Sequence, residues 1–360
     1  MSSLAKPEST YKNSPFIEAL NLRVPSRVPV WFMRQAGRSL PEYRAIRGTG
    51  SILDAVKDPE LAAEITMQPV RRYDVDAAIL YSDIIVPVHA AGFGIDIIPG
   101  RGPITDNPFR QLRDLERISN FSAPDNCSYV AKAIEITSAK LDVPLIGFAG
   151  APFTVASYLI EGGPSRSFIK TKQMMHNDPL LFGALLDRLT QITIDFLVMQ
   201  IKSGVDAIQI FDSWIGALSP REYRKFILVH MKNIFYELSK FGVPMIHFGV
   251  NTSDLLELLA QSGVSAVGLD FRSEITTASK RLGPNVALQG NLDPVVALCS
   301  IDVIKEQARA TLVDSAPAPG YIFNLGHGVL PETEPEKLAE LVEFVHLQGN
   351  AIRGQSTTES

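Results

Sequence analysis

Pro29-Val-Trp-Phe-Met-Arg-Gln-Ala-Gly-Arg38 joins an apolar run to two arginines that stand four positions apart. The run predicts a short buried strand, and the residues after it predict the loop that leaves the strand's carboxyl end. Arginine suits the binding of carboxylates or phosphates, because its guanidinium is planar and always charged. Gly37 would let the backbone come close to a bound anion. The stretch therefore predicts a strand followed by an anion-binding loop.

Seven further apolar runs share the character of the first. Each is short, prone to β structure and continuous rather than alternating, which is typical of parallel strands buried on both faces. The eight runs span 28–32, 77–81, 145–148, 207–211, 245–248, 266–269, 286–288 and 321–325.

The segments between the runs carry helix signals. Ser219-Pro-Arg-Glu222 predicts a capping box with proline at the first helical position, and Gly242 predicts the end of that helix. Ser253 is expected to cap a helix over 254–261. The last helix of the chain is expected to end near Gly349.

Eight strands separated by helices predict an α/β fold, a single-domain (β/α)8 TIM barrel. A doubly wound open sheet is the alternative, but it usually needs fewer strands and would leave some runs unexplained. The barrel is expected to occupy 15–348, between flexible tails at 1–14 and 349–360. Long connections after the first two strands predict extra helices on the N-terminal side, around 58–70 and 129–141.

The composition excludes several classes of protein. A net charge of −5 gives no general preference for nucleic acid, although residues 34–47 hold four arginines against Glu42 alone. Cys127 and Cys299 lack CxxC spacing, which fits a reducing compartment and argues against a disulfide framework or a structural zinc site. No apolar run approaches the ~20 residues of a membrane span, and no secretory signal is visible, so a cytoplasmic protein is expected.

Common catalytic and nucleotide-binding motifs are missing from the sequence. No GxGxxG follows the first run, and no GxxxxGK[ST] occurs, so neither common nucleotide signature is present. No HExxH and no close His/Cys cluster predicts a metal site. No GxSxG elbow predicts acyl transfer.

Polar residues follow each predicted strand, and in such barrels the chemistry lies at the carboxyl ends of the strands. In chain order they are Arg34 and Arg38, Ser82 and Asp83, Thr154 and Tyr158, Asp212 and Ser213, His247 and Asn251, Asp270 and Arg272, Gln289 and Asn291, and Asn324 and His327.

Several of these residues have an alternative structural role. On position alone, Asp83 is equally suited to capping the next helix. Tyr158 fits a packed helical aromatic, and Ser213 fits a local hydrogen bond to the backbone. Two arginines around a glycine-containing turn favour function, and so does His327, which two flanking glycines expose.

Six motifs at the predicted strand ends resemble those of the uroporphyrinogen decarboxylase family, and the resemblance covers nearly the whole chain. They are Phe32-Met-Arg-Gln-Ala-Gly-Arg38 with the following Leu40-Pro-Glu-Tyr-Arg44, Leu80-Tyr-Ser-Asp83, Gly147-Phe-Ala-Gly-Ala-Pro-Phe-Thr154, Tyr158 before Glu161-Gly-Gly163, Phe211-Asp-Ser213, and Phe323-Asn-Leu-Gly-His-Gly328.

The resemblance implies a (β/α)8 barrel, usually a homodimer, that needs no metal or other cofactor. It implies decarboxylation of the four acetate side chains of uroporphyrinogen III to methyls, which yields coproporphyrinogen III for haem and chlorophyll synthesis. By family motif, the substrate-binding residues would be Arg34, Gln35, Ala36, Gly37, Arg38, Asp83, Tyr158, Ser213, Phe211 and His327. A family position that is often phenylalanine falls near Ile52, after a loop that is one residue shorter here.

The implied chemistry assigns catalytic roles to Asp83, Arg34 and Arg38. The arginines would bind carboxylates of the substrate. A pyrrole protonated on carbon would accept the electrons that CO2 leaves behind, and the Asp83 carboxylate would stabilise that cation and accept the pyrrole N–H groups. An arginine, a substrate carboxylic acid or a bound water remain alternatives for the proton donor, since the pKa of arginine lies above ~12.

Two other functions compete with this one. A corrinoid or thiol methyltransferase shares the barrel, but His247-Phe-Gly249 lacks the cysteine of the His-x-Cys zinc ligands in those proteins. A non-catalytic tetrapyrrole carrier would need the arginines but not Asp83.

Overall fold

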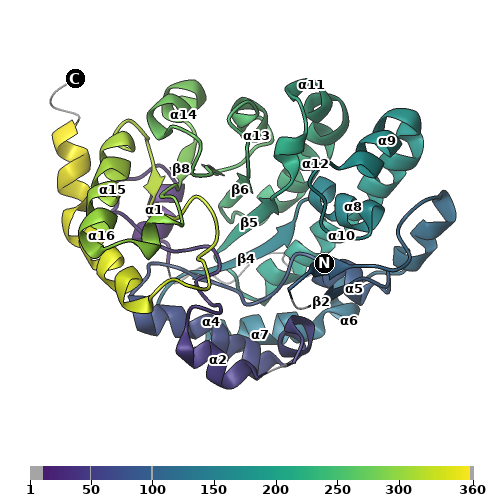
Figure 1. The fold of residues 1–360 in the computed structure, drawn as a ribbon, viewed down its shortest axis with the longest axis horizontal. Helices are drawn as coiled ribbons and strands as arrows, with labels where there is room; N and C mark the ends of the chain where they lie inside the picture. Colours follow the sequence, from purple (N-terminus) through teal and green to yellow (C-terminus); the bar gives the residue numbers. More distant parts are fainter. Residues whose placement is uncertain (1–10, 49, 99, 357–360) are drawn as a thin grey trace.

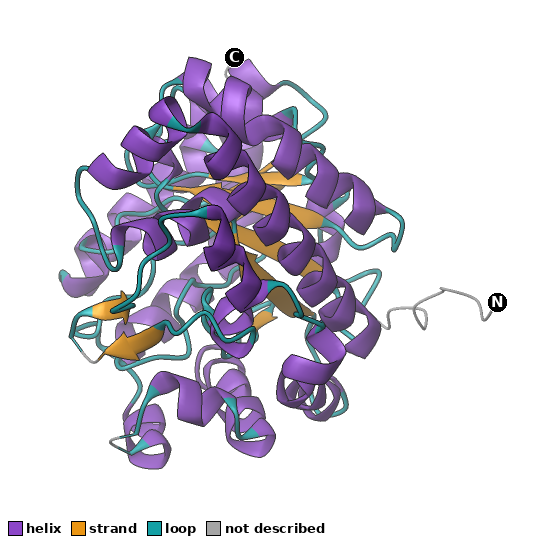
Figure 2. Ribbon diagram, turned by 90° about the vertical axis from the view of Figure 1, so that its right-hand side faces the viewer, coloured by secondary structure: helices purple, strands orange, loops and turns teal. Residues whose placement is uncertain are grey.

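The computed structural model describes residues 11–48, 50–98 and 100–356. Parallel strands form one curled seven-stranded sheet in the order β1-β4-β5-β6-β7-β8-β9, and helices surround it (Figures 1 and 2). Its strands are β1 Ala78–Ile79, β4 Leu145–Gly150, β5 Ala207–Asp212, β6 Met245–Gly249, β7 Ala266–Gly268, β8 Ala287–Gln289 and β9 Tyr321–Ile322. The antiparallel hairpin of β2 Asp96–Ile98 and β3 Gly102–Ile104 lies apart from this sheet.

The predicted first strand, 28–32, is not a regular strand, so the sheet has seven strands rather than the eight expected. Val30 forms only an isolated parallel bridge with Phe323, just after β9. On its other side, Val30 N donates to Asp76 Oδ2 at 2.7 Å, and Asp76 N donates to Val30 O at 2.8 Å. The segment therefore lies between the two edges of the sheet. Pro29 lacks an N–H group, and a side-chain carboxylate replaces a backbone acceptor, so no regular ladder forms.

Helices occupy most of the connections between strands. In chain order they are α1 Pro15–Leu20, α2 Pro41–Arg47, α3 Ile52–Val56, α4 Pro59–Tyr73, α5 Val86–Ala90, η1 Leu112–Ile118, α6 Ala123–Asn126, α7 Ser128–Ser138, α8 Pro152–Glu161, α9 Ile169–Asn177, α10 Pro179–Ser203, η2 Ile215–Ala217, α11 Pro220–Glu222, η3 Tyr223–Ile227, α12 Leu228–Ser239, α13 Leu256–Ala260, α14 Ile275–Leu282, η4 Val296–Leu298, α15 Ile301–Asp314 and α16 Pro335–Ser356. Helices α4 and α7 cover the two stretches where long connections predicted helices. No helix among the described residues is both long and apolar enough to span a bilayer.

Local sequence signals explain some helix boundaries but not others. The predicted capping box is present at α11, where Glu222 N donates to Ser219 Oγ at 3.2 Å and Ser219 N donates to Glu222 Oε2 at 2.8 Å. The prediction that Ser253 caps a helix is wrong, because α13 begins only at Leu256 and the Ser253 hydroxyl instead hydrogen-bonds to Ser273 Oγ at 3.1 Å. Ser253 therefore hydrogen-bonds to a residue distant in the sequence instead of capping a helix.

The predicted end of the last helix near Gly349 is also wrong. Helix α16 continues to Ser356, so most of the expected C-terminal tail is helical. Gly349 packs so closely on the N-terminal segment that an added Cβ would lie 2.8 Å from Val28 Cγ2. Arg353 donates to the backbone carbonyls of Ser315 and Ala318. Packing, not local propensity, extends the helix, as is common in proteins.

The two expected tails are only partly described, since 1–10 and 357–360 lie outside the described residues. The described part of the N-terminal segment contacts the body of the protein. Tyr11 hydrogen-bonds through its hydroxyl to the carbonyl of Leu141, and Ser14 Oγ accepts from Ile17 N at 3.4 Å at the start of α1.

A hydrogen-bonded chain of side chains crosses the interior of the curled sheet. Trp31 Nε1 donates to Gln289 Oε1 at 2.9 Å, and Gln289 Nε2 donates to Gln209 Oε1 at 2.9 Å. Gln209 and Gln289 lie on β5 and β8, which are not neighbours, and all three side chains are buried. The interior of the curled sheet is therefore a packed core, and the open space lies at the strand ends.

Candidate active site

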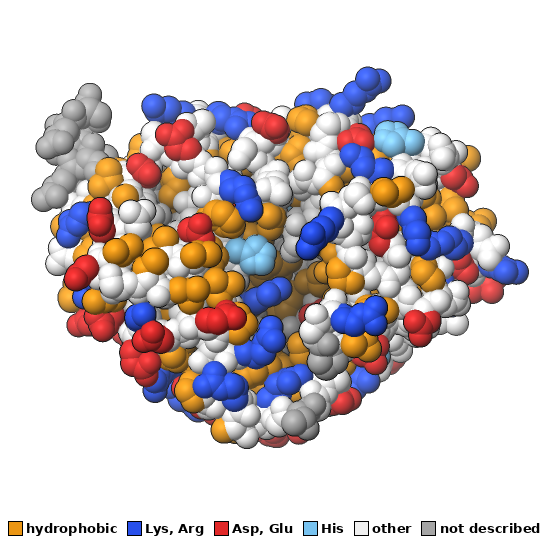
Figure 3. Space-filling view, in the orientation of Figure 1, with side chains coloured by type: hydrophobic (Ala, Val, Ile, Leu, Met, Phe, Trp, Pro, Cys, Tyr) orange, Lys and Arg blue, Asp and Glu red, His pale blue; other side chains and the backbone are white. Residues whose placement is uncertain are grey.

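A cavity of about 900 Å³ lies at the carboxyl ends of the strands. Figure 3 shows this hollow from outside, with apolar side chains within it and lysine, arginine and histidine side chains around it. The structure brings together nine of the ten predicted substrate-binding residues in its lining: Arg34, Ala36, Gly37, Arg38, Asp83, Tyr158, Phe211, Ser213 and His327.

Gln35 is the predicted residue that does not line this cavity. Its side chain is buried, Oε1 accepts from Phe32 N at 3.0 Å, and Nε2 donates to Ala77 O at 3.1 Å. Gln35 therefore connects the arginine-bearing loop to the start of β1. The Gln35 side chain points into the protein, whereas its two neighbours in the loop, Arg34 and Ala36, line the cavity.

Arg34 and Arg38 are both exposed, and neither guanidinium has an ion-pair or hydrogen-bond partner among the described residues. Arg34 adopts a left-handed backbone conformation with φ of 60°. Its side chain lies over Gly328, where a Cβ would come within 2.5 Å of Arg34 Cδ. Gly37 serves the same turn, since a Cβ there would lie 3.0 Å from Arg34 O. Gly37 and Gly328, which come from opposite ends of the chain, therefore leave room for Arg34 at the cavity.

Asp83 follows β1 and accepts a hydrogen bond from Ile85 N at 3.0 Å. It does not cap α5, because the N-cap position of that helix is Ile85, which makes no side-chain capping bond. Burial raises the pKa of the Asp83 carboxyl above its ordinary value, and the bond from Ile85 and the positive charge of Arg34 offset only part of that rise. Asp83 is half-buried, so its carboxyl group is only partly solvated, and a nearby cation would stabilise its charged form.

Burial and nearby charges shift the pKa values of Tyr158 on α8 and of His327 after β9. Burial and, second, the charge of Asp83 raise the pKa of Tyr158 to about 12, so its hydroxyl stays protonated. Burial lowers the pKa of His327, and the charges of Arg34 and Arg272 lower it further. At neutral pH the cavity therefore presents a phenol donor and a neutral imidazole beside the carboxyl group of Asp83 and three arginines, Arg34, Arg38 and Arg47.

Phenylalanines form an apolar wall beside these groups. The Phe211 ring meets Phe148 edge to face with centroids 5.3 Å apart, and it meets Phe248 at 6.1 Å. The three residues come from β4, β5 and β6, and all of them line the cavity. Ile79 and Ile52 add apolar surface, and Ile52 is the residue near the family position that is often phenylalanine.

Several lining residues were not identified from the sequence. They include Tyr43, Arg47, Tyr81, Trp214 and the hairpin residues Ile97, Ile98 and Pro103. The arginine-rich composition of 34–47 was the one signal for Arg47, and adjacency to Ser213 was the one signal for Trp214. The hairpin carries no signal of its own, because its place over the cavity depends on the fold.

Other predicted strand-end residues hold the structure together away from the cavity. His247 is buried, with Nε2 3.5 Å from Asp212 Oδ2. Asp270 accepts from Asn251 N at 2.7 Å, and Asn291 Nδ2 donates to the Asp270 carbonyl at 2.8 Å. Among the described residues, no group of three or more His, Cys, Asp and Glu side chains is arranged to hold a metal ion.

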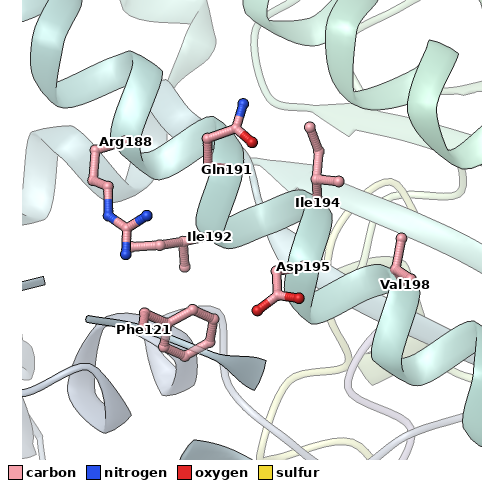
Figure 4. A pocket seen from close by; sticks show the side chains of 7 residues that line it. All are labelled: Phe121, Arg188, Gln191, Ile192, Ile194, Asp195 and Val198. Carbon is pink, nitrogen blue, oxygen red and sulfur yellow. The ribbon is translucent and has the colours of Figure 1, made fainter. Parts of the chain in front are cut away.

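A second, smaller hollow of about 400 Å³ lies along α10 (Figure 4). Phe121 faces the helix across it, and Arg188 and Asp195 are its charged residues. Asp195 Oδ2 accepts from Ala123 N at 2.6 Å, and Arg188 Nε donates to Ile118 O at 2.7 Å. Both charges are bonded to backbone, so the large cavity is the better candidate for a functional site.

Comparison with known proteins agrees with this geometry. The family model described as uroporphyrinogen decarboxylase matches residues 11–348. The uroporphyrinogen decarboxylase of Rhodococcus erythropolis is 51% identical over 340 residues, which cover 93% of this chain and 96% of that protein. That of Mycobacterium leprae is 52% identical over 347 residues, covering 92% of this chain and 97% of that protein.

Among solved structures, a methyltransferase from Methanosarcina mazei is similar, with a TM-score of 0.77 and 23% identity, covering 92% of this chain and 97% of that one. A B12-independent methionine synthase from Shewanella sp. W3-18-1 has a TM-score of 0.55 at 13% identity, covering 81% of this chain and 89% of that one. At these identities the likeness shows the α/β fold alone. The family match and the close relatives decide the assignment, and the chain belongs to the uroporphyrinogen decarboxylase family.

Proposed function

We propose that this protein removes the four acetate carboxyls of uroporphyrinogen III as CO2 and releases coproporphyrinogen III, in porphyrin and haem biosynthesis. One observation carries the proposal. A single cavity contains the half-buried carboxyl group of Asp83 together with two arginines, Arg34 and Arg38, that form no salt bridge among the described residues. A ligand with a cationic centre and anionic arms satisfies both features.

The peripheral carboxylates of the substrate pair with Arg34 and Arg38, whose guanidinium forks suit carboxylates. Tyr158 and Ser213 donate hydrogen bonds to further carboxylates, and the neutral His327 adds another donor or acceptor. The macrocycle lies against the apolar wall around Phe211. These contacts orient the substrate without changing during the reaction.

Asp83 changes its interaction during the reaction. Its carboxylate accepts the pyrrole N–H groups in the bound substrate. When a pyrrole carbon is protonated, the ring becomes a cation, and CO2 departs as its electrons enter that ring, which leaves an exocyclic methylene. A second protonation converts this methylene to the methyl group, and the ring carbon then loses the first proton, which restores the pyrrole. A half-buried carboxylate is only partly screened by water, so it attracts the cation more strongly than it attracts the neutral ring. Asp83 therefore stabilises the transition state more than the ground state, which is the requirement for catalysis.

We also propose three properties of the whole molecule. The segment 28–32 takes the place of the eighth strand of a (β/α)8 barrel. The bridge of Val30 to Phe323 and the hydrogen bonds of Val30 to Asp76 support this placement. Two copies form a homodimer with two-fold symmetry, the usual closed arrangement. The protein works in the cytoplasm, in line with two cysteines that form no disulfide among the described residues.

Anaerobic incubation with uroporphyrinogen, followed by oxidation and separation of the porphyrins by carboxyl number, tests the proposed activity. We expect products with seven, six, five and then four carboxyls in succession, by the chemistry above. Substrate that binds but keeps its eight carboxyls would support a carrier instead. Stoichiometric zinc in the purified protein, together with methyl transfer, would support a methyltransferase.

A further inference from the structure

Trp214 lies against Tyr158 in the cavity wall and has no role in the reaction as described so far. The two ring centroids are 3.8 Å apart, with an angle of 31° between the planes. Tyr158 comes from α8, whereas Trp214 comes from the loop between β5 and η2. Both residues line the cavity. The stacked pair therefore joins helix α8 to the loop after β5 at the site.

The backbone at Trp214 is fixed to the same helix that carries Tyr158. Trp214 N donates to Thr154 Oγ1 at 3.2 Å, and Thr154 Oγ1 donates to Asp212 Oδ1 at 2.7 Å. Thr154 and Asp212 are buried, and Thr154 lies one turn before Tyr158 on α8. The indole is thus held at a set distance from the tyrosine by the strand end and by the helix.

The indole has a second aromatic neighbour. The Phe168 ring packs on Trp214 in a T-shaped arrangement with centroids 5.0 Å apart. Phe168 precedes α9, and Lys172 on that helix donates to Ala217 O at 2.9 Å and pairs with Glu222 at 3.3 Å. The loop that carries Trp214 is therefore bound to α9 as well as to α8.

The Tyr158 hydroxyl has no hydrogen-bond partner among the described residues. Only contacts to the ring set the direction of this hydroxyl, since two side-chain torsions define a tyrosine. The ring contact that the structure shows for Tyr158 is the stacked indole of Trp214. We propose that Trp214 is a positioning residue that holds Tyr158 in the rotamer that directs its hydroxyl into the cavity.

This proposal rests on the proposed function, in which Tyr158 binds a substrate carboxylate. Trp214→Leu removes the flat face but keeps an apolar side chain. We expect it to lower kcat/KM about 5- to 10-fold, the range that one aromatic pair supports. Trp214→Phe keeps a flat ring and should stay within about 2-fold of the parent protein, because most of the stacking remains.

A double-mutant cycle with Tyr158→Phe tests the mechanism. If Trp214 acts through the Tyr158 hydroxyl, Trp214→Leu should cause no further loss in the Tyr158→Phe background. An equal loss in both backgrounds would overturn the proposal and indicate direct contact of Trp214 with substrate. No loss from either single change would overturn it as well. Tyr236→Leu, at an aromatic side chain 66% exposed on α12, is the control for loss of a surface ring.

Folding is checked by thermal unfolding of each variant. If Trp214→Leu does not fold, Phe168→Leu is tested in its place, because this change removes the second aromatic contact of the indole. The same non-additivity with Tyr158→Phe is then expected. Additive losses there would overturn the proposal. An inactive parent protein would instead refute the proposed function, which the uroporphyrinogen assay reports separately.

Discussion

Gly328 leaves the space that the Arg34 side chain occupies, since a Cβ at position 328 would lie 2.5 Å from Arg34 Cδ and 2.8 Å from its Cγ. The two residues are nearly 300 positions apart in the sequence, and they meet because the segment after β9 lies beside 28–32. A residue without a side chain at one end of the chain therefore decides where a cationic side chain at the other end can lie.

Gly328→Ala should displace Arg34 and lower kcat/KM by about 10- to 100-fold, the usual cost of moving a binding group by roughly 1 Å. The uroporphyrinogen assay measures this loss. Gly183→Ala is the matched control, because a Cβ at position 183 on α10 meets nothing within 4 Å. Equal activity of the two variants would contradict the role given to Gly328.

Asp83→Asn should lower kcat by about 100- to 1,000-fold, because the amide cannot stabilise a cation and the loss of one such electrostatic group has that typical cost. The fold should be retained, as judged by circular dichroism. Asp302→Asn, at an exposed aspartate on α15, is the control. Near-normal turnover of Asp83→Asn would remove Asp83 from the mechanism.

The same variant should be more stable than the parent protein at neutral pH. Burial raises the pKa of Asp83 in the folded state, so the folded chain holds this proton at pH values where the unfolded chain has released it. Stability from this group therefore falls as the pH rises from the unfolded pKa of about 3.9 through the raised folded pKa. Unfolding by urea should show an advantage of Asp83→Asn at pH 7 that vanishes at pH 3; the reverse order would contradict the raised pKa.

Arg47→Gln should raise KM about 10-fold with a smaller change in kcat, as expected for loss of a charged hydrogen-bond donor to substrate. Arg47 lines the cavity with Tyr43 and Tyr81, whose hydroxyls are 3.1 Å apart, and its Nε has no partner among the described residues. Steady-state kinetics check this, with Arg224→Gln on η3 as the control at an exposed arginine. An unchanged KM would indicate that Arg47 only supports the loop, where it donates to Gly50 O at 2.7 Å.

Asp76→Asn should lower the free energy of unfolding by about 2–4 kcal/mol, the range for breaking a buried, hydrogen-bonded charge network. The buried Asp76 carboxylate accepts from Val30 N at 2.7 Å and from Arg27 Nε at 2.9 Å, and it lies 2.7 Å from His346 Nε2. Urea unfolding at pH 7 measures the change against Asp302→Asn. A loss no larger than that of the control would show that this network does not hold the N-terminal segment in place.

Much of the candidate site could be predicted because it depends on local order along the chain. A polar residue directly after a buried parallel strand must emerge at the carboxyl edge of the sheet, so Asp83, Ser213 and His327 follow from the apolar runs before them. The same logic could not place Gln35. In a loop the direction of each side chain depends on backbone torsions, and the amide of Gln35 found its partners in the core.

Tertiary contacts decided what local patterns left open. The run 28–32 is as apolar as the others, yet whether it becomes a strand depends on neighbours about 45 and 290 positions away, Asp76 and Phe323. Helix α16 passes Gly349 because that glycine packs on Val28.

The sequence by itself determined seven of the eight strand runs, the carboxylate and arginines that follow such runs, and the family. These features depend on residue identity and on short spacing along the chain, and neither requires the folded structure. Only the tertiary structure decided that Trp214 stacks on Tyr158, that Arg47 reaches the cavity and that Gly328 makes room for Arg34. Each of these depends on separate segments of the chain, which come together only once the sheet has curled.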